Sequence, residues 1–75
     1  MQKKELKIID ENLNIELKKG DKILVEPFNG KKQGYIFEEL SLHKEYRLSE
    51  VTTGSKIVVG IKWFNYEKTS YLWEE

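Results

Sequence analysis

The stretch KIVVGIKWF, residues 56–64, decides the fold. Its bulky apolar side chains fall on every second position: Ile57, Val59, Ile61 and Trp63. Successive side chains of a β-strand point to opposite faces, so this alternation predicts a strand over residues 56–64 with one apolar face. Residues 65–68 then predict a turn, and residues 69–74 predict a strand that returns beside the first.

The loop length of this C-terminal hairpin sets which aromatic residues face inward. An odd-length loop places Trp63 across from Tyr71, with every bulky side chain on the inner face. An even loop places Trp73 across from Gly60 and leaves an outward row of aromatic residues. Monomers rarely expose such a patch without a use, so the odd register is favoured. The even register stays open.

A second hairpin is predicted around Asn29 and Gly30. Residues 22–26 and 33–38 are apolar runs rich in strand-forming residues, and Asn-Gly lies between them. Asn-Gly favours a two-residue type I′ turn, because both residues adopt positive φ at low cost.

That two-residue turn implies a register for the hairpin. Ile23 is expected opposite Ile36, and Leu24 opposite Tyr35. Pro27 has no N–H to donate to a neighbouring strand, so we expect it at a bulge or an edge.

The rest of the chain predicts shorter elements. Residues 1–4 are polar and expected to fray. Residues 6–10 and 14–17 read as two short strands around a turn. Residues 39–46 favour an irregular loop over one short helical turn, and residues 46–48 favour a strand. The apolar residues of the second short strand share one face, Ile15 and Leu17.

Composition also favours β structure. The 75 residues include seven Ile, four Val and nine aromatic residues, but no Ala. β-branched and aromatic side chains fit a pleated sheet, whereas Ala is the best helix former. Five or six short strands at intervals of about ten residues are typical of a small barrel or sandwich. We therefore expect one all-β domain that covers residues 1–75.

Charge and residue usage exclude several classes. Thirteen Lys and Arg balance 13 Asp and Glu, and there is no Cys. Disulfides and thiolate metal sites are therefore excluded. Neutral net charge argues mildly against nucleic acid, which basic proteins usually bind. No apolar run reaches the roughly 20 residues of a membrane span, and no signal-peptide pattern is present, so a cytoplasmic location is expected.

Part of the first hairpin resembles a known element. Residues 19–25 combine a Gly-Asp turn with an apolar strand, and residues 30–36 combine a basic glycine loop with a second apolar strand. This pattern resembles the KOW-type element of SH3-like barrels, with Gly34 as the key glycine and Lys31 and Lys32 as the basic loop residues. The resemblance covers about a quarter of the chain. It implies an SH3-like barrel of five or six strands that binds RNA, proteins or peptides.

Catalytic signals are weak. His43 is the only imidazole and lies in a charged segment. No glycine-flanked serine elbow is present to supply a nucleophile. Adjacent carboxylates in a strand point to opposite faces, so the acidic pairs make poor acid–base dyads. We expect no enzyme activity, no catalytic residues, no metal and no cofactor.

The leading expectation is a non-catalytic adaptor that binds another protein through an aromatic and lysine-bearing hairpin face. Tyr and Trp are enriched in binding hot spots, and lysines attract an acidic partner. Alternatives are a nucleic-acid-binding module that also uses Lys44 and Arg47, and a small inhibitor or enzyme subunit. A homodimer stays open. The expected partner-binding residues are Phe28, Lys31, Lys32, Tyr66, Tyr71 and Trp73.

Overall fold

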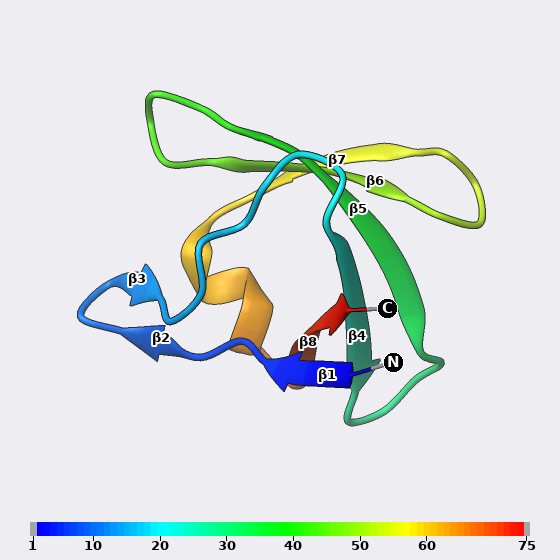
Figure 1. Ribbon diagram of the computed structural model, residues 1–75. Coiled ribbons are helices and arrows are strands. Elements are labelled where there is room, and N and C mark those ends of the chain that lie inside the picture. The colour runs from blue at the N-terminus through cyan, green and yellow to red at the C-terminus, as the bar shows by residue number, and fades with distance from the viewer. Residues whose placement is uncertain (1, 75) are drawn as a thin grey trace.

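The computed structural model describes residues 2–74, in which six strands join into one antiparallel sheet (Figure 1). The order across the sheet is β1-β8-β4-β5-β6-β7, so β1 and β7 are its two edges. The all-β prediction is confirmed. The strands of this sheet are β1 (Gln2–Glu5), β4 (Lys22–Pro27), β5 (Gln33–Leu40), β6 (Tyr46–Glu50), β7 (Lys56–Val59) and β8 (Lys68–Glu74).

Two shorter elements lie outside the sheet. β2 (Ile8–Ile9) and β3 (Asn12–Leu13) form a small antiparallel ribbon. Its turn, Asp10 and Glu11, has positive φ at both residues, as a type I′ turn requires. The only helical element of residues 2–74 is a 3-10 turn, η1 (Ile61–Asn65).

The predicted strand over residues 56–64 is wrong in its second half. The strand ends at Val59, and η1 follows Gly60. A strand would point Trp63 and Phe64 to opposite faces, whereas the 3-10 turn brings both rings together, with Phe64 fully buried and the centroids 5.2 Å apart. The tertiary core therefore overrides the local alternation.

The predicted C-terminal hairpin is also wrong in both of its registers. β8 pairs with β4 and β1, not with β7, because η1 carries the chain to the other end of the sheet. Ser70 and Leu72 are the buried residues of β8. Tyr71 and Trp73 alternate with them and therefore lie on the outer face.

The β4–β5 hairpin is shifted by one residue from the predicted register. Ile23 lies opposite Tyr35, and Leu24 lies opposite Gly34. Residues directly opposite in an antiparallel pair share a face, so this register buries Ile23 with the larger Tyr35 ring rather than with Ile36. Asn29 and Gly30 do not have the positive φ of a type I′ turn.

Pro27 is the last residue of β4, in the interior of the sheet order. It lies beyond the last residue pair between β4 and β5, Val25 with Gln33, and pairs only toward Lys68 of β8. Its missing N–H therefore leaves the β4–β5 ladder intact.

The remaining expectations meet a mixed outcome. Residues 1–4 were expected to fray, but residues 2–4 pair with β8 as part of the edge strand β1, and residue 1 lies outside the described residues. Residues 39–46 form no helical turn: β5 continues to Leu40 through a bulge, and the expected strand at 46–48 is confirmed as β6. Residues 14–17 form no strand.

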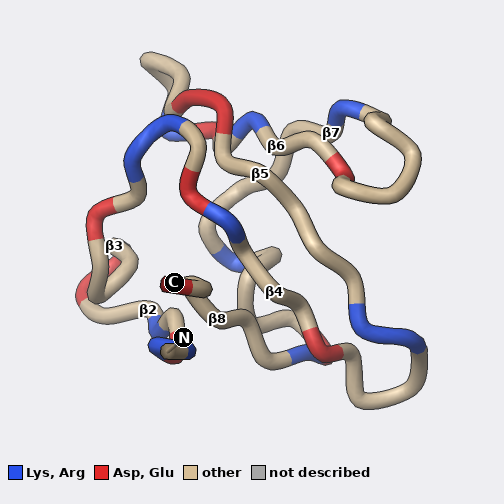
Figure 2. The backbone as a smooth tube through the Cα atoms, turned by 45° about the vertical axis from the view of Figure 1, so that its right-hand side comes forward, with Lys and Arg blue, Asp and Glu red and all other residues tan. Residues whose placement is uncertain are grey.

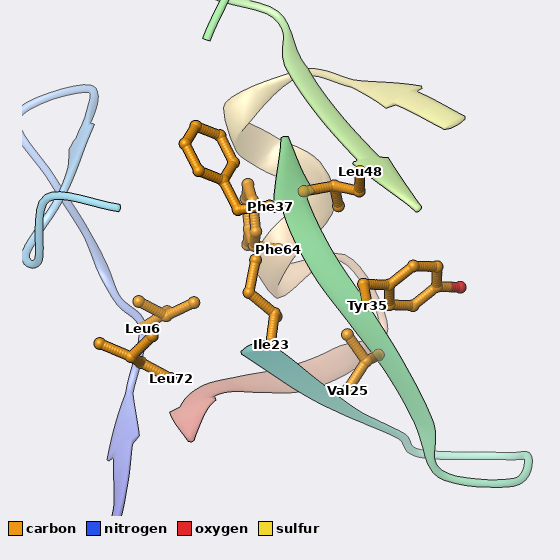
Figure 3. Packing of buried hydrophobic residues seen from close by; sticks show 8 residues of the cluster. All are labelled: Leu6, Ile23, Val25, Tyr35, Phe37, Leu48, Phe64 and Leu72. Atoms are coloured by element: carbon orange, nitrogen blue, oxygen red, sulfur yellow. The ribbon is translucent and has the colours of Figure 1, made fainter. Parts of the chain in front are cut away.

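Eight buried side chains form the core (Figure 3), and they come from both ends of the chain. Alternate residues of β4 and β5 enter it, as the period of two requires. Ile15 and Leu17 pack against it without being in a strand. The core residues are Leu6, Ile23, Val25, Tyr35, Phe37, Leu48, Phe64 and Leu72.

No helix within residues 2–74 is long and apolar enough to cross a membrane.

Candidate partner-binding site

Two aromatic side chains of residues 2–74 are largely exposed, and they line the same cleft. Phe28 is 70% exposed and Tyr66 is 68% exposed. The cleft has a volume of about 320 Å³ and is open to solvent on one side. Its remaining wall comes from Pro27, Asn29, Glu67 and Lys68. Residues far apart in the sequence thus line one cleft, in which two exposed aromatic rings lie among polar side chains.

Pairing between β4 and β8 builds this cleft. The ladder ends where Pro27 lies opposite Lys68. One residue further, the Phe28 N–H donates a hydrogen bond to the Glu67 carbonyl at 3.1 Å. Glu67 has φ +54°, a left-handed conformation that turns the chain from Tyr66 into β8. The two aromatic residues are therefore held on neighbouring turns.

Lys68 forms part of the wall and is held from two sides. Its Nζ donates to the Tyr66 carbonyl at 3.0 Å and lies 4.4 Å from the centre of the Trp63 ring. The Trp63 ring in turn packs edge-on against Tyr35, with centroids 5.4 Å apart. Burial lowers the pKa of the Lys68 ammonium, although the nearby Glu67 carboxylate acts in the opposite direction.

Lys31 and Lys32 lie on the β4–β5 turn, next to the cleft residue Asn29 in the chain. Lys32 is 3.8 Å from the Glu26 carboxylate, which also binds Lys3 at 3.3 Å. Lys31 makes no ion pair with any residue of 2–74. Of the two lysines on this turn, Lys31 can therefore bind an acidic partner without first breaking an ion pair with a carboxylate of residues 2–74.

Tyr71 and Trp73 lie outside the cleft. Both are half-buried on the outer face of β8. The Lys3 ammonium lies 4.7 Å from the centre of the Tyr71 ring, and Trp73 is opposite Lys3 on β1 and Lys22 on β4. The six expected binding residues therefore fall into two groups. One group lies at the cleft and on the adjacent β4–β5 turn, and the other, Tyr71 and Trp73, lies on the outer face of β8.

The basic residues expected to bind nucleic acid do not form one positive patch. Lys31 and Lys32 precede β5, whereas Lys44 and Arg47 follow it, so the two pairs lie at opposite ends of that strand (Figure 1). Arg47 is also engaged, since its Nη1 binds Glu39 at 2.7 Å. Positive and negative segments are scattered over the backbone, and the positive ones do not form a single stripe (Figure 2).

His43 lies exposed on the turn between β5 and β6, where its backbone N–H donates to Ser41 Oγ at 3.3 Å. Within residues 2–74 no group of three or more His, Cys, Asp or Glu side chains is placed to hold a metal ion.

The tip of the Asn29-Gly30 hairpin was expected in the binding surface, but sequence reasoning missed three of the cleft residues: Pro27, Glu67 and Lys68. A turn at 65–68 was expected, but a turn alone does not indicate which other turn lies beside it. That neighbour depends on the β4–β8 pairing.

No family model, curated protein or solved structure matches this chain.

Proposed function

We propose that the protein is a non-catalytic binding module that engages a segment of another protein in the cleft between Phe28 and Tyr66. The observation that carries the proposal is the convergence of the two largely exposed aromatic rings in one hollow. A small domain needs its large apolar side chains in the core, so exposing two of them together forgoes about 1.5–3 kcal/mol of burial for each. Binding hot spots are enriched in such residues.

The partner segment is extended and carries an apolar side chain, proline or aliphatic, that fits between the two rings. An acidic residue follows, because Lys31 lies next to the cleft and makes no ion pair with any residue of 2–74. The shallow, solvent-exposed shape suits a short segment rather than a deep small-molecule site.

We also propose that the fold is an SH3-like barrel with a KOW-type first hairpin. Two observations support it. Strands β4 to β7 follow one another across the sheet, and β8 returns beside β4 after a 3-10 turn. The test is a set of nuclear Overhauser contacts, in which core side chains from the two halves of the curled sheet, such as Leu72 of β8 and Leu48 of β6, should both contact Phe64 while the outer backbone edge of β7 stays unpaired within the chain.

Selection from a displayed library of random 12-residue peptides tests the function. The wild type is expected to enrich peptides with a proline or aliphatic residue followed by Asp or Glu. Phe28→Ser and Tyr66→Ser should each weaken a selected peptide at least tenfold, about 1.4 kcal/mol. Leu42→Ser is the matched control, because Leu42 is fully exposed on another turn.

Failure to enrich any peptide, or equal losses from Leu42→Ser and Phe28→Ser, would reject the cleft as the binding site. Binding of a single-stranded oligonucleotide that survives both cleft substitutions would instead support the nucleic-acid alternative.

A further inference from the structure

We propose that two copies of this chain associate by pairing their β7 strands antiparallel, edge to edge. This interaction is separate from the cleft and does not rest on the proposed function. β7 is one edge of the sheet, and no strand of residues 2–74 pairs with its outer side.

The two edges of the sheet differ in their protection. β1 has the sequence QKKE, and charged side chains such as Lys3 and Lys4 discourage pairing with another chain. β7 has the sequence KIVV, with a single charge at its start and Val58 56% exposed. An apolar edge strand without inner charges is a template for strand addition.

The backbone pattern identifies which groups of β7 are free. The Glu50 N–H donates to the Ser55 carbonyl at 2.8 Å, which makes these two residues a hydrogen-bonded pair. Hydrogen-bonded pairs alternate along an antiparallel ladder, so Ile57 and Val59 direct their N–H and C=O toward β6. Lys56 and Val58 direct theirs outward.

A two-fold axis through Val58 satisfies this pattern. The two Val58 residues then exchange both of their backbone hydrogen bonds, and Ile57 lies opposite Val59 of the second copy. Residues opposite each other share a face, so the inner faces of both sheets stay aligned. Lys56 lies opposite Gly60, which is extended at φ −85° and ψ 174°.

Charge complementarity favours a second copy of this chain as the partner that pairs with β7. Glu45 precedes Tyr46, the partner of Val59, and therefore flanks Gly60 on the neighbouring strand. In the dimer, Lys56 of one copy and Glu45 of the other lie two strand spacings apart, about 10 Å between Cα atoms, which their extended side chains span. Neither residue makes an ion pair within residues 2–74. The symmetry creates this pair twice.

Sedimentation velocity over a concentration series tests the proposal. Because a short strand pair buries less than a standard interface, we expect a dissociation constant on the order of 100 µM. The average mass should rise from 8.9 kDa toward twice that value. Val58→Pro removes the outward N–H and should keep the chain monomeric, whereas Leu42→Lys, which adds charge to an exposed turn, should not.

A charge exchange distinguishes pairing in this register from non-specific association. Lys56→Glu and Glu45→Lys should each weaken the dimer, and the double variant should restore it. A chain that stays monomeric at about 1 mM overturns the proposal, and so does a dimer that Val58→Pro leaves intact. Failure of the double variant to recover overturns the register, provided that each variant keeps the wild-type dichroism spectrum.

Discussion

Glu67 occupies a backbone conformation that suits glycine. Its φ of +54° lies in the left-handed region, where residues other than Gly, Asn and Asp are strained by about 1–2 kcal/mol. Glu67→Gly should raise the free energy of unfolding in urea by about 0.5–1 kcal/mol, since glycine also gains freedom in the unfolded chain. Glu67→Ala keeps the strain and should bring no gain. A less stable glycine variant would contradict the strain.

Ser70 is a polar residue in the core. It is fully buried on β8, and its hydroxyl donates to the carbonyl of Phe64 at the end of the 3-10 turn. Ser70→Ala leaves that carbonyl without this donor, so it should cost about 1–3 kcal/mol of unfolding free energy. Thr52→Ala, at an exposed turn, serves as the control. Equal stabilities for the two variants would show that the hydrogen bond is immaterial.

At the scale of elements, the N-terminal segment belongs to the fold. Leu6 is fully buried, its N–H donates to the Ser70 carbonyl at 2.8 Å, and its carbonyl accepts from Asn65 Nδ2 at 3.1 Å. Leu6→Ala should therefore cost about 2–5 kcal/mol in chemical denaturation. Ile9→Ala, at a residue that is 55% exposed, should cost far less. A loss below that of Ile9→Ala would mean that this segment is not docked in solution.

The elements with a clear period of two were predictable, and those set by tertiary contacts were not. The strands around Ile23, Tyr35 and Ile57 follow their alternation. After Gly60, however, the same alternation continues through a 3-10 turn, because the position of Phe64 depends on a core assembled from distant strands. Asn29-Gly30 predicted a hairpin correctly but not its register, since burial of Tyr35 outweighed the local turn preference.

The candidate site was predictable only in part. Phe28 and Tyr66 were singled out as aromatic residues next to turns, and the structure exposes both. Their shared cleft depends on β8 pairing with β4, which no local pattern indicates. The same pairing reverses the expected inward orientation of Tyr71 and Trp73.

For the whole molecule, alkaline pH should destabilise the fold. Burial raises the pKa of Tyr35, with a further contribution from the Glu50 charge, and burial raises that of Tyr46 above the ordinary value of 10.0. Above about pH 10 the unfolded chain loses these phenolic protons while the folded chain retains them, so stability falls as pH rises toward the folded values. The lowered pKa of Lys68 has the opposite effect on stability. Stability gains from it as pH rises, but only until the Lys68 ammonium of the unfolded chain has also lost its proton, near the ordinary pKa of 10.5.

Urea midpoints between about pH 9 and about pH 11.5 measure this fall. Tyr46→Phe should flatten it, because the variant has one fewer phenol to ionise. A midpoint that rises steadily over this range would contradict the assignment of both tyrosines.

The most direct measurement for the binding function is an amide chemical-shift titration of the ¹⁵N-labelled protein with a selected peptide. The largest shifts are predicted at residues 28–29 and 66–68, which line the cleft, and at Lys31 on the adjacent turn. Shifts centred on Tyr71 and Trp73, or spread evenly over the sheet, would contradict the assignment of the cleft.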